Sequence, residues 1–171
     1  MSHNMIRLVV LGIVVVFTAC QDPPPPAPIA GPLEGAWKIV EWSGAGADTS
    51  WTQVAPQPSL YLFGKEYYSV MYINGTEARA LFEEGTPGGT DAEKVAGYNT
   101  FIANSGSYAI SGTNVTTSPM VAKWPNYMTG DQSATFAYRV EGDNLWLENV
   151  SNTFTTETPS IIVTTKLERI E

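Results

Sequence analysis

The side chains that most often carry out catalysis, histidine and cysteine, are confined to the first 20 residues of this chain. The single histidine is His3 and the single cysteine is Cys20. Beyond that point the sequence can form no Ser-His-Asp triad, no Cys-His pair and no histidine-ligated metal site. The titratable groups that remain are carboxylates, tyrosines, lysines and arginines. We therefore expect no metal, no cofactor and no enzyme activity.

Aromatic side chains are the better candidates for a functional role. Several tyrosines and phenylalanines fall on one face of their expected strand or helix, and together they would enclose an apolar space bordered by a few hydroxyl groups. Because a tyrosine hydroxyl is costly to bury without a partner, such a set favours a wet or ligand-holding interior over a dry core. The candidate ligand-binding residues are Tyr61, Phe63, Tyr68, Tyr98, Phe101, Tyr108, Phe136 and Tyr138.

The N-terminus predicts export. Residues 1–19 hold one arginine, Arg7, followed by an apolar run that suits a secretory signal better than a membrane span. The segment Phe17-Thr18-Ala19-Cys20 resembles a bacterial lipobox, in which the cysteine thiol takes a lipid. We expect a lipoprotein anchored through Cys20, exported and facing the periplasm from the outer membrane. The alternative is an ordinary signal peptide with Cys20 left as a free thiol.

Residues 20–33 read as a spacer between this anchor and a domain. The run PPPPAP favours an extended polyproline helix, which would hold the domain about 35–40 Å from its anchor. Loss of Arg7 with the signal leaves eight basic and 17 acidic residues, a net charge of −9. A surface of this sign repels phosphate backbones, so a nucleic-acid partner is not expected. The remaining residues, 34–171, suffice for one domain.

Short runs of β-forming residues separated by turn signals predict an all-β domain. Residues 44–58, which include Trp51, are expected to form a long loop that acts as a lid. The pattern over residues 77–84 does not decide between a short strand and a helical turn. The expected strands span residues 34–43, 59–63, 66–73, 107–111, 115–121, 132–141, 144–150 and 160–170.

One helix is expected in this β sequence, beginning after Thr90. Thr90 and Glu93 have the spacing of a capping box. Apolar residues at helical spacing up to Ile102 form one face, which should pack against the sheet, and the helix should stop at residues 104–106. The apolar face comprises Val95, Tyr98, Phe101 and Ile102.

Eight antiparallel strands in sequence order close into an up-and-down barrel, which removes exposed sheet edges. A barrel of this size is either filled by side chains or holds one small ligand. Glu41 shares the parity of Trp37 and would lie inside or at the rim, where a raised pKa could make it an acid or base. An isomerase or lyase is therefore one alternative, unless the strand bulges before Glu41 and leaves it in solvent.

Four stretches of this sequence resemble the bacterial lipocalin-like domain family over roughly residues 33–170. Gly35-Ala36-Trp37 is similar to the Gly-x-Trp start of lipocalins, and the runs GYNTFIANSGSYAISG, WPNYMTGDQ and VEGDNLWLENV follow in the family's order. The resemblance implies a calycin-type barrel with a ligand cavity. It also implies that Arg169, on the last strand, stacks on Trp37 and closes the base of the barrel.

Three functions remain open from the sequence. The first is binding of a small apolar or amphipathic molecule inside a barrel tethered to a membrane. The second is a structural or interaction role for a barrel filled by its own side chains. The third is the carboxylate- and tyrosine-dependent enzyme.

Overall fold

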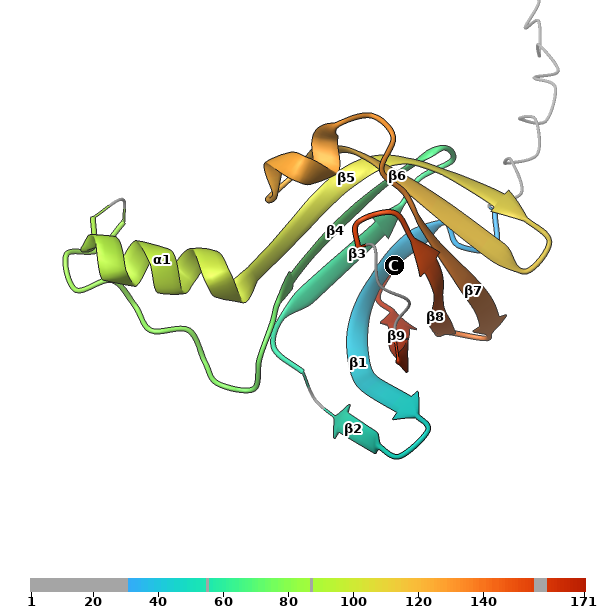
Figure 1. Cartoon of the computed structure of the whole chain (residues 1–171), viewed down its shortest axis with the longest axis horizontal. Helices are drawn as coiled ribbons and strands as arrows, with labels where there is room; N and C mark the ends of the chain where they lie inside the picture. The colour runs from blue at the N-terminus through green and yellow to red at the C-terminus, as the bar shows by residue number, and fades with distance from the viewer. Residues whose placement is uncertain (1–30, 55, 87, 156–159) are drawn as a thin grey trace, which may run out of the picture.

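The structure, a computed structural model, is a closed antiparallel β-barrel from which one helical arm projects (Figure 1). It describes residues 31–54, 56–86, 88–155 and 160–171. The expected signal peptide, Cys20 and nearly all of the spacer lie outside these residues. In the described part the elements are β1 (Gly35–Gly46), β2 (Ser50–Val54), β3 (Ser59–Phe63), β4 (Tyr67–Ile73), α1 (Asp91–Thr100), β5 (Phe101–Ser111), β6 (Asn114–Ala122), the 3-10 turn η1 (Pro125–Met128), β7 (Ala134–Glu141), β8 (Asn144–Asn152) and β9 (Ile161–Arg169).

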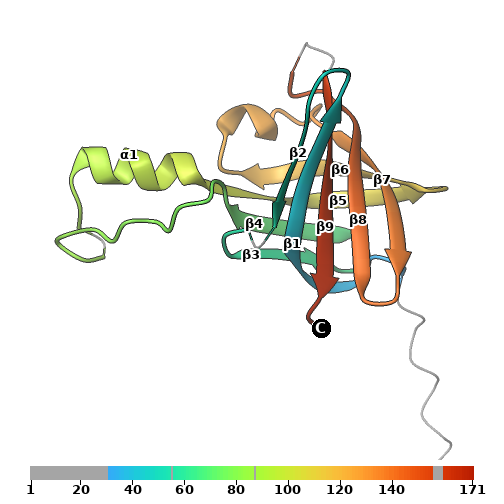
Figure 2. The same cartoon turned by 90° about the horizontal axis from the view of Figure 1, so that it is seen from below.

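Strands β1 and β3–β9 form the expected eight-stranded up-and-down barrel. Each strand pairs antiparallel with the next, and β9 returns to pair with β1, from Trp37↔Arg169 to Gly46↔Ile161. The tight turns that join β3 to β4, β5 to β6 and β7 to β8 lie at one end, as Figure 2 shows from a second side. We call that end the base and the opposite end the mouth.

The predicted lid over residues 44–58 was wrong, because much of it is strand. β1 runs on to Gly46 and turns back into β2, with Gly44 opposite Trp51. The start of β1 pairs with β3 instead, at Gly35–Trp37. β2 therefore continues the line of β3 toward the mouth, after an interruption that includes Pro56 and Pro58, which cannot donate to a ladder.

A bulge in β1 decides which of its side chains face the interior. The register against β9 shifts between Ile39 and Glu41, so the alternation restarts one residue late. Trp37 and Ile39 are buried, but beyond the bulge it is Trp42 that faces inward. The alternative of a bulge before Glu41 is therefore confirmed, and the alternative that places Glu41 inside the barrel is wrong. Its backbone pairs with Val54 and Lys166, and its side chain does not line the interior.

The base is filled by an apolar core. The fully buried side chains there are Leu33, Trp37, Leu145 and Leu167, packed beside Phe63. The Trp37 indole N–H donates to the Leu33 carbonyl at 2.8 Å. They include the largest fully buried side chains among the described residues, and their burial stabilises the barrel.

Arg169 closes this end in the way the resemblance implied. Its guanidinium carbon lies 3.9 Å from the centroid of the Trp37 ring, and its Nη1 donates to the Glu34 carbonyl at 2.7 Å. The two residues are also direct partners in the β1–β9 ladder. A cation–π contact and a charged hydrogen bond therefore join the end of β9 to the start of β1.

The helix begins where the sequence predicted but does not cover the barrel. Thr90 and Glu93 form the capping box, and hydrogen bonds to Thr90 and the Glu83 amide hold the pKa of Glu93 below its ordinary value. No residue of α1 is buried, and the side chains of Val95 and Tyr98 are 58% and 49% exposed. The expected packing of its apolar face against the sheet was wrong, since α1 points away from the barrel in both views (Figures 1 and 2).

The helix also ends earlier than predicted. Phe101 is extended and starts β5, where it pairs with Ile73 of β4, and Ile102 is buried in the barrel. The helical spacing of four apolar residues predicted a longer helix, but residues 101–107 pair with β4 instead. The strand is preferred because its ladder satisfies more backbone groups and buries Ile102. Residues 77–84, left undecided by the pattern, form neither helix nor strand.

Candidate functional site

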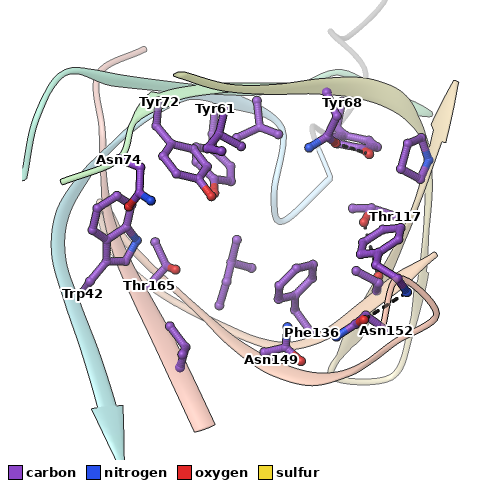
Figure 3. Close-up of a pocket in the computed structure, with 18 of the residues that line it drawn as sticks. Trp42, Tyr61, Tyr68, Tyr72, Asn74, Thr117, Phe136, Asn149, Asn152 and Thr165 are labelled. Carbon is purple, nitrogen blue, oxygen red and sulfur yellow. Dashed lines mark hydrogen bonds between the residues drawn. The ribbon is translucent and has the colours of Figure 1, made fainter. Parts of the chain in front are cut away.

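The barrel encloses a cavity of about 510 Å³ between the base and the mouth. This volume lies within the range of sites for small molecules. Its wall holds many aromatic rings, which come from β1 to β4, from β7 and from the segments around the mouth (Figure 3). The aromatic lining residues are Trp42, Trp51, Tyr61, Phe63, Tyr68, Tyr72, Trp124, Tyr127, Phe136 and Phe154.

Four of the eight aromatic residues predicted as ligand contacts lie in this wall: Tyr61, Phe63, Tyr68 and Phe136. Tyr61 and Phe63 alternate along β3, and Tyr68 belongs to β4. Phe136 comes from β7 on the opposite wall. Strand periodicity was enough to place these four, because the side chains alternate without interruption along β3, β4 and β7. The register shift beside Phe136 puts its extra residue in β8 and leaves the alternation of β7 unchanged.

Tyr108 and Tyr138 lie below the cavity, at the base. The Tyr108 hydroxyl donates to the Gly64 carbonyl, and its ring meets the Phe63 ring edge-on at 5.3 Å between centroids. The Tyr138 hydroxyl donates to the Gly112 carbonyl at 3.4 Å. Both face the barrel interior but sit too close to the base turns to reach the cavity, and the expectation that they line it was wrong.

Tyr98 and Phe101 also lie outside the cavity wall, because the arm does not fold over the mouth. The Tyr98 hydroxyl donates to the Lys123 carbonyl at 3.2 Å, and the Lys123 ammonium stands 4.3 Å from the Tyr98 ring centroid. The ring of Phe101 lies 5.9 Å from the guanidinium of Arg79. The first pair of contacts joins α1 to the segment after β6, and the second joins the segment before α1 to the start of β5. Neither contact encloses a ligand.

The mouth carries aromatic residues that sequence reasoning missed. The rings of Tyr127 and Phe154 stack at 3.9 Å between centroids, and Trp124 meets Tyr127 edge-on at 5.1 Å. These residues come from η1 with its flanks and from the segment after β8, two parts of the chain with no shared periodicity. The pairing of β7 with β8 places the segment before β7 beside the segment after β8. The sequence around each aromatic residue therefore could not predict this cluster.

Tyr72 is a further missed residue, and for it a signal did exist. Tyr68, Val70 and Tyr72 alternate along β4, and all three line the cavity. The ring of Tyr72 stacks on Tyr61 at 6.5 Å with an interplanar angle of 12° and meets Trp42 edge-on at 5.3 Å. Tyr61, Tyr72 and Trp42 thus form one continuous aromatic wall.

Polar groups interrupt the aromatic wall at a few points. The amide lining residues are Gln53, Asn74, Asn104, Asn149 and Asn152. The Tyr68 hydroxyl donates to Asn104 Oδ1 at 2.6 Å, and Asn152 Oδ1 accepts from the Phe154 amide at 3.0 Å. Asn149 Oδ1 is buried and has no hydrogen-bond partner among the described residues. The lining can therefore offer both donors and acceptors to a guest molecule.

Burial governs the ionisation of the lining tyrosines. It raises the pKa of Tyr72 to about 12, with a smaller contribution from Tyr127. Burial also raises the pKa of Tyr68 to about 12, although a hydrogen bond with the Thr117 side chain lowers that pKa in part. For Tyr61, burial raises the pKa well above its ordinary value, and the neighbouring Tyr72 and Tyr68 add to the rise. All three hydroxyls are therefore protonated donors at neutral pH.

These shifts predict a loss of stability at alkaline pH. The pKa of Tyr68 and Tyr72 is higher in the folded protein than the value of about 10 in an unfolded chain. Their contribution is therefore complete below about pH 10 and is lost as the pH rises from there toward about 12. Thermal unfolding measured between about pH 10 and pH 12 should show a melting temperature that falls as the pH rises. In Tyr72→Phe, which lacks one of these hydroxyls, the melting temperature should fall less over the same interval. Tyr67→Phe, on the exposed outer face, is the control, and equal slopes in wild type and Tyr72→Phe would contradict the assignment.

The described part of the chain was also searched for a metal-binding cluster and for a membrane-spanning helix. Across residues 31–54, 56–86, 88–155 and 160–171, no three His, Cys, Asp or Glu side chains gather where they could hold a metal ion. Within the same ranges, none of the helices has the length and apolar character needed to cross a membrane.

Comparison with known proteins places this barrel in a family. Among solved structures, the chain is similar to a lipocalin-like protein from Bacteroides uniformis, with 13% identity and a TM-score of 0.44 over 82% of this chain and 100% of that one. It is also similar to an uncharacterized protein from Bacteroides eggerthii, with 12% identity and a TM-score of 0.42 over 80% and 98% of the two chains. A search of the curated proteins finds no match. The family model of the lipocalin-like domain matches residues 34–167, and the chain therefore belongs to the lipocalin-like domain family.

Proposed function

We propose that this protein binds a small apolar or amphipathic molecule inside its barrel. The observation that carries the proposal is the cavity of about 510 Å³, walled by ten aromatic residues and bordered by tyrosine hydroxyls and amides. A purely structural barrel of this size would be filled by its own side chains. Here Trp37, Leu145, Leu167 and their neighbours fill the base, and the cavity lies between the base and the mouth.

We further propose that binding is not followed by chemistry. Glu41 was the carboxylate considered as an acid or base, and the bulge in β1 directs it away from the cavity. Among the residues that line the cavity, the only titratable side chains are tyrosines, whose raised pKa values keep them protonated. Such a wall suits recognition better than proton transfer at neutral pH.

Ligand binding is tested with the purified chain and a panel of small hydrophobes and lipids. Trp42 and Trp51 in the cavity wall should report binding by a change in fluorescence, accompanied by a rise in melting temperature. Thr165→Phe, which places a ring in the cavity, should weaken binding at least tenfold. Thr164→Phe, one residue away on β9 and outside the lining, is its matched control. Absence of any fluorescence or thermal response across the panel would refute the proposed function.

The proposed setting is an exported protein anchored in a membrane through lipidated Cys20, with the barrel held away from the bilayer. The support is the lipobox-like segment 17–20 and the proline-rich spacer after it. Expression of the full chain in a bacterium with an outer membrane should place it in the membrane fraction with the mass of a lipid adduct. Cys20→Ser should release it, and an unmodified Cys20 in the wild-type chain would contradict the anchor.

A further inference from the structure

Four neighbouring strands of the barrel contain no charged residue. β3, β4, β5 and β6 hold no Asp, Glu, Lys or Arg, whereas β1, β7, β8 and β9 each hold at least one. On that charged side Lys38 of β1 and Glu168 of β9, for example, form an ion pair at 3.1 Å. The chain as a whole has a net charge of −8 at pH 7. One side of this acidic barrel is therefore free of charge.

We call the outer side of β3, β4, β5 and β6 the uncharged face. Residues paired across neighbouring strands lie on the same side of a sheet. At the centre of the face Ser69 is opposite Ser105, and Ser105 Oγ donates to Ser69 Oγ at 2.8 Å. Exposed apolar side chains lie on both sides of these two small residues, so another surface can approach closely. The central residues are Leu62, Ser69, Met71, Ala103, Ser105 and Val121.

The arm, residues 74–86 and 88–100, also exposes apolar side chains. It is held together internally, since Arg79 Nη2 donates to the Gly97 carbonyl and the Glu83 amide donates to Glu93 Oε1, both at 3.0 Å. Nevertheless no residue of α1 is buried, and Leu81 is 91% exposed. A helix of 10 residues is only marginally stable in water unless one of its faces packs against another surface. Cover from a further surface would therefore stabilise α1.

The arm does not cover the uncharged face of its own barrel, because α1 continues the line of β5 beyond the mouth (Figures 1 and 2). A second copy of the chain supplies both missing surfaces at once. With a twofold axis between the copies, the arm of each lies on the face of the other, and the contact is closed.

Charge favours a second copy over a membrane as the occupant of this face. Two chains of net charge −8 meet through this side without placing like charges together, and charged residues are depleted from the cores of protein interfaces. An anionic membrane surface would repel the same net charge, and the uncharged face has no Lys or Arg to attract it.

We infer that this chain forms a twofold dimer in which the arm of each copy packs, through Leu81 and Val95, on the uncharged face of the other. The outward residues of the four strands and one side of the arm together reach about the 20–30 residues a side of a stable interface. The dimer is independent of the proposed ligand binding, because the face lies on the outside of the barrel.

Sedimentation velocity of the full chain carrying Cys20→Ser tests the dimer, since this change removes both the lipid and any disulfide between copies. The protein should sediment as a dimer that dissociates on dilution. Met71→Lys and Val121→Lys in the face, and Val95→Lys on the arm, should each raise the dissociation constant about tenfold or more, because each buries an unpaired charge. Val150→Lys, at an exposed valine on β8 outside the face, is the matched control and should leave it unchanged.

A second measurement does not depend on the lysine variants. Hydrogen exchange of the α1 amides should slow as the protein concentration rises through the range of dimer formation, since the second copy then covers the helix. A monomer at every concentration, equal dissociation constants for Val95→Lys and Val150→Lys, or exchange of α1 that is independent of concentration would overturn the inference. Binding of a monomer to phosphatidylethanolamine vesicles that is lost in Met71→Lys would assign the face to a membrane and overturn it as well.

Discussion

Replacing Trp37 with alanine is expected to destabilise the barrel by about 3–5 kcal/mol, the cost of deleting a large ring from a well-packed core. Trp37 is fully buried and touches the core at the base of the barrel. Its removal also leaves the Leu33 carbonyl without its donor and Arg169 without the ring on which it lies. Because typical domains are stable by only about 5–15 kcal/mol, this single change should unfold a large part of the population on mild heating.

Urea or thermal unfolding of Trp37→Ala measures this effect, and Trp146→Ala is the matched control. Trp146 also lies under a guanidinium, with Arg139 3.7 Å from its ring centroid, but on the partly exposed outer face of β8. Its loss should cost about 1 kcal/mol. If the two variants lose similar amounts of unfolding free energy, burial of Trp37 at the base is not the source of its effect on stability.

Substitution of Gly106 with alanine is expected to lower the free energy of unfolding by about 3 kcal/mol. The cause here is overpacking, whereas Trp37→Ala leaves a cavity. Gly106 lies at the bulge where β5 meets β6, with Ser105 opposite Val121 and Gly106 opposite Pro119. A Cβ at Gly106 would overlap the carbonyl oxygen of Ser118 and lie 2.8 Å from the Cα of Pro119. Both atoms belong to the backbone, so they cannot move aside without breaking the ladder.

The comparison variant is Gly64→Ala. A Cβ at Gly64 would have as its nearest neighbour the Tyr67 carbonyl oxygen at 3.5 Å, an ordinary contact. The same chemical change should therefore alter the unfolding free energy there by less than about 0.5 kcal/mol. If chemical denaturation gives Gly106→Ala the stability of wild type, the close approach of β5 and β6 at this bulge is not required by the fold.

Several features of this protein follow from local sequence alone. The alternation of Tyr61 with Phe63, the turns at residues 64–66 and 142–143, and the capping box at Thr90 depend on interactions within a few residues. Such interactions are nearly independent of the rest of the chain, so strands, turns and the helix start could be predicted. The up-and-down closure followed as well, because eight consecutive antiparallel strands leave two edges that satisfy each other.

The position of each inward residue along the barrel axis was decided only by the tertiary structure. Because of the bulge in β1, Trp42 and not Glu41 faces the interior. Pairing of Phe101 with Ile73 ends the helix, and α1 projects from the barrel. Register then puts Tyr138 in the base and Tyr72 in the cavity, although both are inward-facing tyrosines on β-strands. Side-chain type and alternation specify a face, whereas depth depends on hydrogen bonds between strands far apart in the chain, and those bonds are not encoded in any short stretch of residues.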